Sequence, residues 1–216
     1  MKRLSLLVAL ALAFVTGCTT AQPQQAPPPA AVVPPPVERP VWASEAERPK
    51  WTVEDPAVEG TTIFFVGAAE RYATEPEARD QAMRNSIKMV VGYLGTQAKD
   101  KYEKVATSFG LSSAVVDPTN ASREYEKQLS ENVVKKAKAK KWYIEQWNYP
   151  TGMGYKVFAL VSVPVDEVND AFKQTAKQNM EDAQKAARAA SDTQAKSQAE
   201  NAAKFWEEMT KQGVVE

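Results

Sequence analysis

Histidine is absent from the 216-residue chain, and cysteine occurs once, as Cys18. Without histidine there is no Ser-His-Asp triad, no Cys-His pair and no histidine-ligated zinc or iron. A single cysteine forms no disulfide within the chain, so stability must come from packing. We therefore expect no cofactor and no metal site.

An excess of charge of either sign is also lacking. Lysine plus arginine total 27, and aspartate plus glutamate total 27. Removal of Lys2 and Arg3 with an export signal would leave a net charge of about −2. Because no positive field covers the chain, nucleic acid is not an expected partner.

Several catalytic motifs are missing as well. The sequence has no Walker A loop, no EF-hand loop and no serine followed three residues later by lysine. A cell-wall hydrolase that uses two carboxylates remains as a less favoured alternative, with Glu70 as the carboxylate that hints at a site. A salt bridge at a strand end explains Glu70 equally well, so we expect a protein that is not an enzyme.

The first feature that is present is an export signal. Lys2 and Arg3 precede an apolar run over residues 4–15, which is too short to span a bilayer. The string VTGC that ends at Cys18 looks like the lipobox of bacterial lipoproteins, whose cysteine is acylated and becomes the first mature residue. An ordinary signal peptide with an incidental cysteine is the alternative. We predict a signal peptide over residues 1–17 and lipid, such as palmitate, on Cys18.

The predicted lipid also predicts a location. Each buried CH₂ contributes about 0.8 kcal/mol, so two or three acyl chains make a stable membrane anchor. Thr19 follows the cysteine where an aspartate would retain the protein in the inner membrane, by resemblance to sorting in enteric-type envelopes. We therefore expect the cell outer membrane, with the chain facing the periplasm or the cell surface.

A proline-rich tract follows the anchor. Eight prolines lie between Thr19 and Pro40, and a polyproline II conformation would extend this tract to roughly 70 Å at about 3.1 Å per residue. We predict a tether over residues 18–46, although such a tract can also serve as the ligand of a proline-reading domain.

A folded domain is predicted over residues 47–180. Its entry repeats the pattern Glu-Arg-Pro-x-Trp, which ends at Trp42 and again at Trp51. We interpret these two tryptophans as buried clamps that hold the tether on the domain, with a ligand-binding aromatic pair as the alternative.

The first half of the domain reads as a strand and two helices. An apolar strand over residues 62–66 ends at Gly67, and both of its faces are expected to be covered. Thr74 and Glu77 form a capping-box pattern with Pro76 in the first turn of a long helix. The apolar stripe of this helix comprises Ile87, Val91, Leu94, Ala98, Tyr102, Val105 and Phe109. Gly92 and Gly95 interrupt the stripe and predict either a close backbone approach or a kink.

A second helix is predicted to end in a lysine cluster. Tyr125, Leu129, Val133 and Ala137 share one face of it. The cluster comprises Lys135, Lys136, Lys138, Lys140 and Lys141. Cations at a helix C-terminus are explained by the helix dipole, and a patch that binds anionic envelope material is the sharper hypothesis.

Two strands follow, over residues 142–149 and 155–163, joined by a five-residue hairpin loop over residues 150–154. Gly152 and Gly154 are assigned to this turn, because no third glycine completes a dinucleotide-binding pattern. Aromatic residues lie on both faces of the first of these strands. Trp147 and Tyr149 are therefore candidate partner contacts.

The chain is predicted to be helical from Asp166 nearly to its end. Core contact is expected to stop near Met180, which leaves an alanine-rich tail over residues 181–216 that either packs against another helix or stays solvated. Phe205 and Trp206 are interpreted as two exposed aromatics that form a partner hook.

The resulting fold prediction is α+β, with a small antiparallel sheet packed on helices in two layers and a long C-terminal helix. Its order is strand, helix, helix, hairpin, helix. The segments RPKW at residues 48–51, FFVGAAE at 64–70, EARDQAM at 77–83 and GYKVFALVSVP at 154–164 resemble the Lpp-twenty family of bacterial surface lipoproteins over residues 47–172. The resemblance implies a two-layer α/β domain on an outer-membrane anchor, often in envelope or flagellum-associated assemblies, with no catalytic site.

The function predicted from the sequence is therefore that of a lipid-anchored bacterial envelope protein. Its α/β domain would bind or scaffold a partner at the outer membrane without catalysis. The expected partner is an envelope protein or a cell-wall component. The alternative is a glycan-binding or small-molecule-binding module, which would need a pocket beside the hairpin aromatics.

Overall fold

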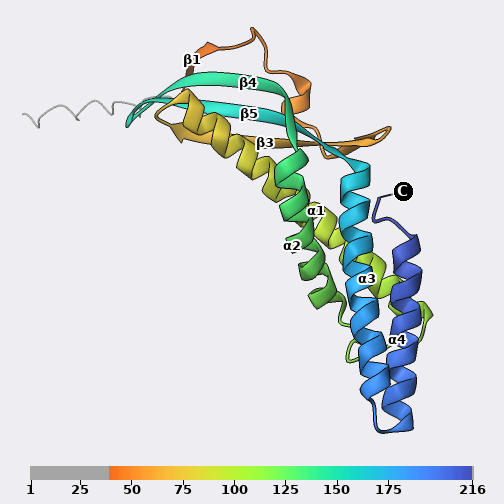
Figure 1. Cartoon of the computed structure of the whole chain (residues 1–216). Helices are drawn as coiled ribbons and strands as arrows, with labels where there is room; N and C mark the ends of the chain where they lie inside the picture. The colour runs from red at the N-terminus through yellow and green to blue at the C-terminus, as the bar shows by residue number, and fades with distance from the viewer. Residues whose placement is uncertain (1–38, 216) are drawn as a thin grey trace, which may run out of the picture. The chain divides into compact units, whose positions relative to one another are not determined.

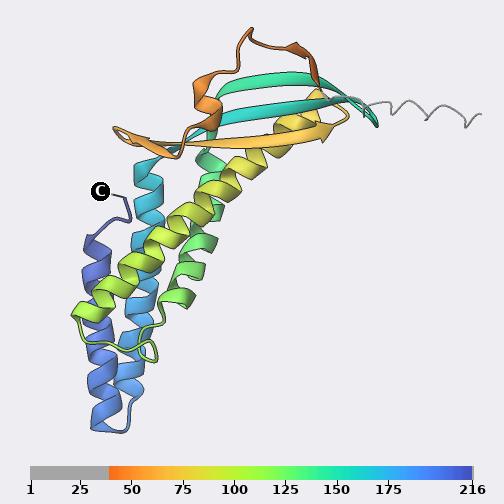
Figure 2. The same cartoon turned by 180° about the vertical axis from the view of Figure 1, so that it is seen from behind.

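The computed structural model describes residues 39–215, so the predictions for the signal peptide, Cys18 and most of the proline-rich tract lie outside the described residues. Within that range the chain forms one five-stranded antiparallel sheet and four α-helices, which confirms the α+β class. The helices lie on one face of the sheet, and the segment between the first two strands crosses the other face (Figures 1 and 2).

The elements follow one another in a simple order. They are β1 (Arg39–Ala43), the 3-10 helix η1 (Lys50–Val53), β2 (Ala57–Glu59), β3 (Thr62–Tyr72), α1 (Glu75–Ser108), α2 (Pro118–Lys136), β4 (Lys138–Tyr149), β5 (Gly152–Pro164), α3 (Val165–Ala189) and α4 (Thr193–Lys211). In the sheet the strand order is β1-β4-β5-β3-β2, with every neighbouring pair antiparallel. The two edge strands are the short ones, β1 and β2.

The edge strand β1 lies in a region where the sequence predicts tether. Arg39–Ala43 pairs with β4, and the register shifts between Pro40 and Trp42. A proline and a bulge at a sheet edge discourage pairing with another strand. Trp42 is 49% exposed on this strand, so its predicted burial as a clamp is wrong.

Strand β3 extends six residues beyond Val66, the last residue of the predicted strand. Gly67 does not end it, because Gly67 is a packing site: a Cβ there would lie 2.1 Å from the Ala82 carbonyl oxygen and 2.5 Å from the Ser86 nitrogen of α1. The absent side chain lets the helix backbone approach the sheet. Up to Ala69, the residues of β3 that face the helices are buried, and those on the opposite face are half-buried.

The hairpin of β4 and β5 is tighter than predicted. Tyr149 pairs directly with Gly152, so Pro150 and Thr151 alone connect the strands where five residues were expected. Gly152 has φ +122°, a backbone conformation that a residue with a side chain rarely adopts. Both strands are longer than predicted because backbone pairing continues beyond their apolar residues.

Helix α1 begins as the sequence predicts. The Thr74 side chain accepts a hydrogen bond from the Glu77 N–H and donates one to the Glu77 carboxylate at 2.8 Å. The first half of the helix packs under the sheet through Ala78 and Ala82, and its second half enters a helical core through Leu94. One long helix therefore joins two hydrophobic clusters.

The buried stripe of α1 matches the prediction only in its middle, because Val105 is half-buried and Phe109 is 39% exposed and lies just beyond the last helical residue, Ser108. Leu94, Ala98 and Tyr102 are buried as expected, whereas Ile87 and Val91 are half-buried at the margin of the core. The stripe drifts because 3.6 residues per turn do not keep a fixed spacing aligned over 34 residues. The predicted close backbone approach is found at neither glycine, since a Cβ at Gly95 would meet the Glu126 side chain of α2 and Gly92 faces open space.

Helix α2 confirms its predicted face. Tyr125, Leu129 and Val133 are fully buried against α1 and α3. Asp117 caps the helix by accepting from the Thr119 and Asn120 N–H groups. The core of the bundle therefore contains one stripe from each of α1, α2 and α3.

The C-terminal region is a helical hairpin and not one long helix. Helix α3 ends at Ala189, Asp192 caps the next helix, and α4 packs back along α3 (Figure 1). The half-buried Ala183 and Ala187 of α3 belong to the predicted alanine stripe, and its partner helix is α4 of the same chain. Small side chains allow two helices to approach closely.

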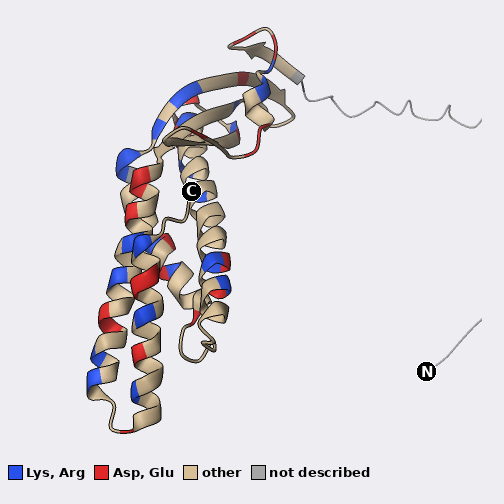
Figure 3. Ribbon diagram, turned by 90° about the vertical axis from the view of Figure 1, so that its right-hand side faces the viewer, with Lys and Arg blue, Asp and Glu red and all other residues tan. Residues whose placement is uncertain are grey.

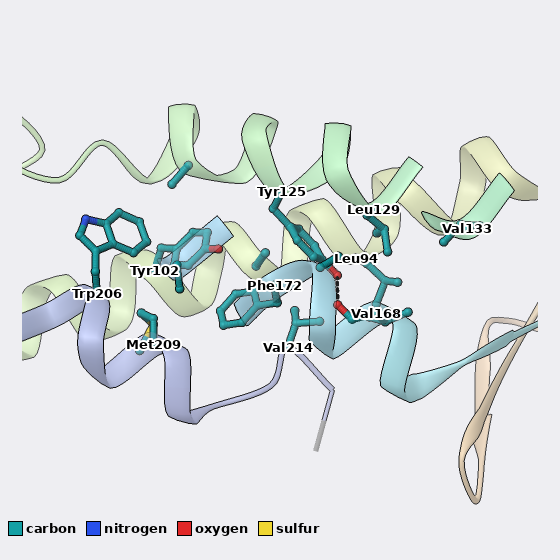
Figure 4. Close-up of a cluster of buried hydrophobic side chains, with 14 of the residues drawn as sticks. Leu94, Tyr102, Tyr125, Leu129, Val133, Val168, Phe172, Trp206, Met209 and Val214 are labelled. Atoms are coloured by element: carbon teal, nitrogen blue, oxygen red, sulfur yellow. Dashed lines mark hydrogen bonds between the residues drawn. The ribbon is translucent and has the colours of Figure 1, made fainter. Parts of the chain in front are cut away.

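The core extends well beyond Met180. Phe205 is fully buried and Trp206 is 5% exposed, so their interpretation as an exposed partner hook is wrong. Trp206 packs edge-on against Tyr102, which stacks on Phe172 (Figure 4). The hairpin turns α4 toward the core, which a continuous helix could not do.

Candidate functional site

The face of the sheet opposite the helices, here called the outer face, holds the candidate site. Alternation along β3 places Phe64 and Val66 on this face, and Leu160 of β5 pairs with Val66. These side chains are half-buried because residues 44–56, here called the arm, cover part of the face between β1 and β2.

One buried carboxylate fixes the arm to the sheet. Glu145 on β4 accepts two hydrogen bonds from Arg48 of the arm, at 2.6 Å from Nη2 and 3.0 Å from Nε. Its other oxygen accepts a bond from Trp147 Nε1 at 2.7 Å. The Glu145 side chain is 4% exposed, so its charge depends on these donors.

The pKa of Arg48 and that of the neighbouring Tyr143 are also shifted beside Glu145. The hydrogen bond to Glu145 raises the pKa of Arg48, and burial partly opposes that rise. Burial, together with the Glu145 charge, raises the pKa of Tyr143. The guanidinium also lies 5.1 Å from the Phe158 ring centroid. Arg48 therefore stays charged and the phenol stays neutral at neutral pH.

A second ion pair occupies the outer face toward the hairpin. Lys156 pairs with Glu70, and its ammonium lies 5.4 Å from the Phe158 ring and 6.0 Å from the Trp147 ring. The salt-bridge interpretation of Glu70 is therefore the one that the structure supports, with Lys156 as its partner. Arg71, whose φ is +64°, lies over the Tyr149 ring.

Trp147 and Tyr149, the predicted partner contacts, are largely engaged within the domain. Their rings stack at 6.1 Å between centroids. Trp147 is half-buried and donates to Glu145, and Tyr149 is 8% exposed. Both side chains thus stabilise the outer face and offer little free surface.

A trough lies at the other end of the outer face, with a cavity volume of about 460 Å³. Its floor is apolar and consists of Phe64, Val66 and Leu160, and Trp51 of η1 borders it. Neither Trp147 nor Tyr149 lines this trough. The second tryptophan of the sequence repeat therefore covers the sheet as predicted, and the first does not.

Five exposed charged residues surround the trough. On the side of the arm and β2 are Glu54, Asp55 and Glu59, and on the side of β4 are Lys140 and Lys141. Within residues 39–215 none of the five forms an ion pair. Elsewhere, Figure 3 shows charges of both signs interspersed along the helices. At the trough, the negative charges therefore lie on one side and the positive charges on the other.

A β-bulge explains why two consecutive lysines border one trough. The register of β4 against β5 shifts between Ala139 and Lys141, which leaves Lys140 as the extra residue. In a regular strand these two neighbours would point to opposite faces. The predicted lysine cluster is therefore divided: α2 ends at Lys136, and Lys138, Lys140 and Lys141 belong to β4.

The remaining lysines of the cluster lie apart from the trough. Lys136 forms an ion pair with Glu167 of α3 at 3.0 Å, and Lys135 lies in the last turn of α2. The trough contains none of the residues Lys135, Lys136 or Lys138. The five lysines thus do not form the single helix-end patch that the sequence predicts.

Sequence reasoning missed the acidic side of the trough and the Arg48–Glu145 pair. Glu54, Asp55 and Glu59 form a short acidic cluster next to the Trp51 repeat, which is a signal that the sequence does carry. The pair has no such signal, because 97 residues separate its members. The bulge at Lys140 has none either.

Across residues 39–215, no cluster of three or more potential ligand residues is arranged to hold a metal ion. In the same range, no helix combines the length and the apolar character needed to cross a membrane. No protein-family model, no curated protein and no solved structure matches the chain.

Proposed function

We propose that the protein is a lipid-anchored bacterial envelope protein whose α+β domain binds a partner, without catalysis, in the outer-face trough. The observation that carries the binding proposal is the combination of an apolar floor with five charged side chains that have no ion pair among the described residues. Apolar clefts with a few convergent polar groups are where ligands bind in most proteins.

The proposed outer-membrane location is supported by features of the sequence. The short apolar run before Cys18 and the proline-rich tract after it support an acylated anchor and a spacer, and Thr19 supports the outer membrane. The resemblance to the Lpp-twenty family supports the same location. The partner is an envelope protein or a cell-wall component that the tether can reach.

Glu70, the carboxylate that the sequence offered for hydrolysis, and the buried Glu145 are both engaged within the domain. A two-carboxylate hydrolase needs one acid that donates a proton and a second that attacks or activates water. Glu70 is held by Lys156, and Glu145 is held by Arg48 and Trp147. Both carboxylates therefore serve contacts within the domain.

Photo-crosslinking in living cells tests the proposal. A photoreactive amino acid replaces Glu59 or Lys141 at the trough, and a matched control replaces the exposed Lys196 on α4. We expect the same adduct from both trough positions and not from the control, with its mass identifying a peptide-containing or glycan-containing partner. Equal capture from all three positions, or capture from none, would contradict binding at the trough.

A further inference from the structure

The charges around the trough are arranged as two opposed walls. Glu54 and Asp55 follow η1, and Glu59 ends β2, so the acidic wall lies at the β2 edge of the sheet. Lys140 and Lys141 form the basic wall on β4. Strands β3 and β5 lie between the walls and supply the apolar floor.

The strand order sets the distance between the walls. Neighbouring strands are about 4.8 Å apart, so β4 and β2, which are three steps apart, are separated by about 14 Å across the sheet. Glu59 pairs with Thr62, whereas Lys141 lies level with Val66, so the backbones of Glu59 and Lys141 are also offset by about 14 Å along the strands and lie about 20 Å apart on the diagonal. The side chains of both walls reach into this gap. The long lysine side chains reduce the gap that a ligand must span. An extended peptide advances about 3.4 Å per residue, so three or four residues fill the gap.

We propose that the trough binds a short extended peptide with two free ends, its ammonium at the acidic wall and its carboxylate at the basic wall. This inference rests on the proposed function and names the ligand class of the same site. The apolar side chains of the peptide would contact Phe64, Val66 and Leu160, and its length follows from the strand spacing.

Other ligand chemistries fit the two walls less well. A polyanion meets repulsion at Glu54, Asp55 and Glu59, and a polycation meets it at Lys140 and Lys141. A neutral glycan leaves all five charges without a partner. A phospholipid headgroup carries its two charges only a few bonds apart, so it cannot reach both walls.

The test measures peptide binding to the full-length protein in detergent by calorimetry. The probes are the tetrapeptide Ala-Leu-Val-Ala with free ends, the same peptide with only the amine acetylated, with only the carboxylate amidated, and with both ends blocked. We expect the free peptide to bind at least fivefold more tightly than the doubly blocked peptide, because each exposed charge pair adds a modest gain.

Two wall variants determine the orientation. Lys140→Gln with Lys141→Gln should weaken the free and the acetylated peptides about fivefold and leave the amidated peptide unchanged. Glu54→Gln, Asp55→Asn and Glu59→Gln together should weaken the free and the amidated peptides and leave the acetylated peptide unchanged. Lys196→Gln with Lys204→Gln on α4 is the control for net charge and should change nothing.

The outcomes distinguish this inference from the proposed function. Equal binding of free and blocked peptides, or no peptide binding at millimolar concentration while crosslinking at Glu59 and Lys141 still succeeds, overturns the peptide inference alone. Loss of both the crosslink and peptide binding overturns the proposed function as well. The acetylated peptide keeps only its carboxylate, which is assigned to the basic wall. If the triple substitution of Glu54, Asp55 and Glu59 changes the affinity for this peptide, the assigned orientation is wrong and the inference is contradicted.

Discussion

Arg48 and Glu145, 97 residues apart in the sequence, form a two-bond ion pair at 2.6 and 3.0 Å that fixes the arm to the outer face of the sheet. Glu145 is buried, whereas Arg48 is 39% exposed. Without the pair, Arg48 could still be hydrated by solvent, whereas the buried Glu145 carboxylate could not, so the ion pair matters more for Glu145 than for Arg48. Movement of the arm would leave the buried Glu145 charge without its cationic partner.

The first prediction concerns this pair. Arg48→Met should lower the free energy of unfolding by about 2 kcal/mol, because it leaves the Glu145 charge buried without its main donor. Adding Glu145→Gln removes the charge and keeps an acceptor for Trp147, so the double variant should be more stable than Arg48→Met alone. Urea denaturation of the wild type, Arg48→Met, Glu145→Gln and the double variant measures the coupling. Additive losses would show that the pair is not coupled.

The second prediction concerns the buried hydroxyl of Tyr102, which has no hydrogen-bond partner among the described residues. Tyr102→Phe should be neutral or stabilise the fold by about 1 kcal/mol, because it removes an unsatisfied polar group. Tyr125 is the matched control, since its hydroxyl donates to the Val168 carbonyl at 3.5 Å (Figure 4). Tyr125→Phe should not stabilise. A clear loss of stability in Tyr102→Phe would show that the hydroxyl has a partner.

The third prediction concerns alkaline pH. Burial raises the pKa of Tyr102 and of Tyr125 above the usual value of about 10. The folded state therefore keeps both phenols neutral, while unfolding lets them ionise. Their contribution to stability is complete below pH 10 and falls above it by about 1.4 kcal/mol per pH unit for each tyrosine. Urea titrations from pH 9 to 11.5 should show a smaller slope in Tyr102→Phe, and an unchanged slope would contradict the burial argument.

The fourth prediction compares two glycines. Gly67→Ala should destabilise the protein by about 3 kcal/mol or more, because its Cβ would clash with the backbone of α1. Gly92→Ala should stabilise it by up to about 1 kcal/mol, because that position lies inside a helix and faces open space. Thermal unfolding measures both shifts. Similar effects at the two positions would contradict the close packing of β3 on α1.

The fifth prediction concerns the C-terminal hairpin. Trp206→Ala should cost about 3 to 5 kcal/mol, because it removes a large side chain from the core around Tyr102. Lys204→Ala, two residues away on the exposed face of α4, should change stability by less than about 0.5 kcal/mol. Equal effects would support a solvated tail in place of a packed one. Urea denaturation distinguishes the two cases.

The anchor has its own test. Cys18→Ala should move the protein out of the membrane fraction and abolish palmitate incorporation, while the circular dichroism of the domain stays unchanged. The expectation follows because acyl chains, and not the folded domain, would hold the protein at the membrane. Retention of the variant in the membrane fraction would contradict the lipobox interpretation.

Local signals predicted the starts and faces of several elements. The Thr74–Glu77 capping box set the start of α1, and the apolar spacing of Tyr125, Leu129 and Val133 set the buried face of α2. These signals succeed because their interactions lie within one turn or one face of a helix. The three central strands were predicted too short, since backbone pairing continues through polar residues such as Lys138, and the short edge strands β1 and β2 were not predicted.

The sequence by itself predicted the α+β class and the capped start of α1, which the structure confirms, because these depend on residues close together in the chain. The address at Cys18 is likewise a local signal and stays a prediction. Only the tertiary structure decided that Trp206 is buried, that Arg48 reaches Glu145 and that Lys140 and Lys141 face one trough. A helical hairpin, a pair 97 residues apart and a β-bulge create these contacts. Each depends on where distant segments meet, which no local pattern encodes.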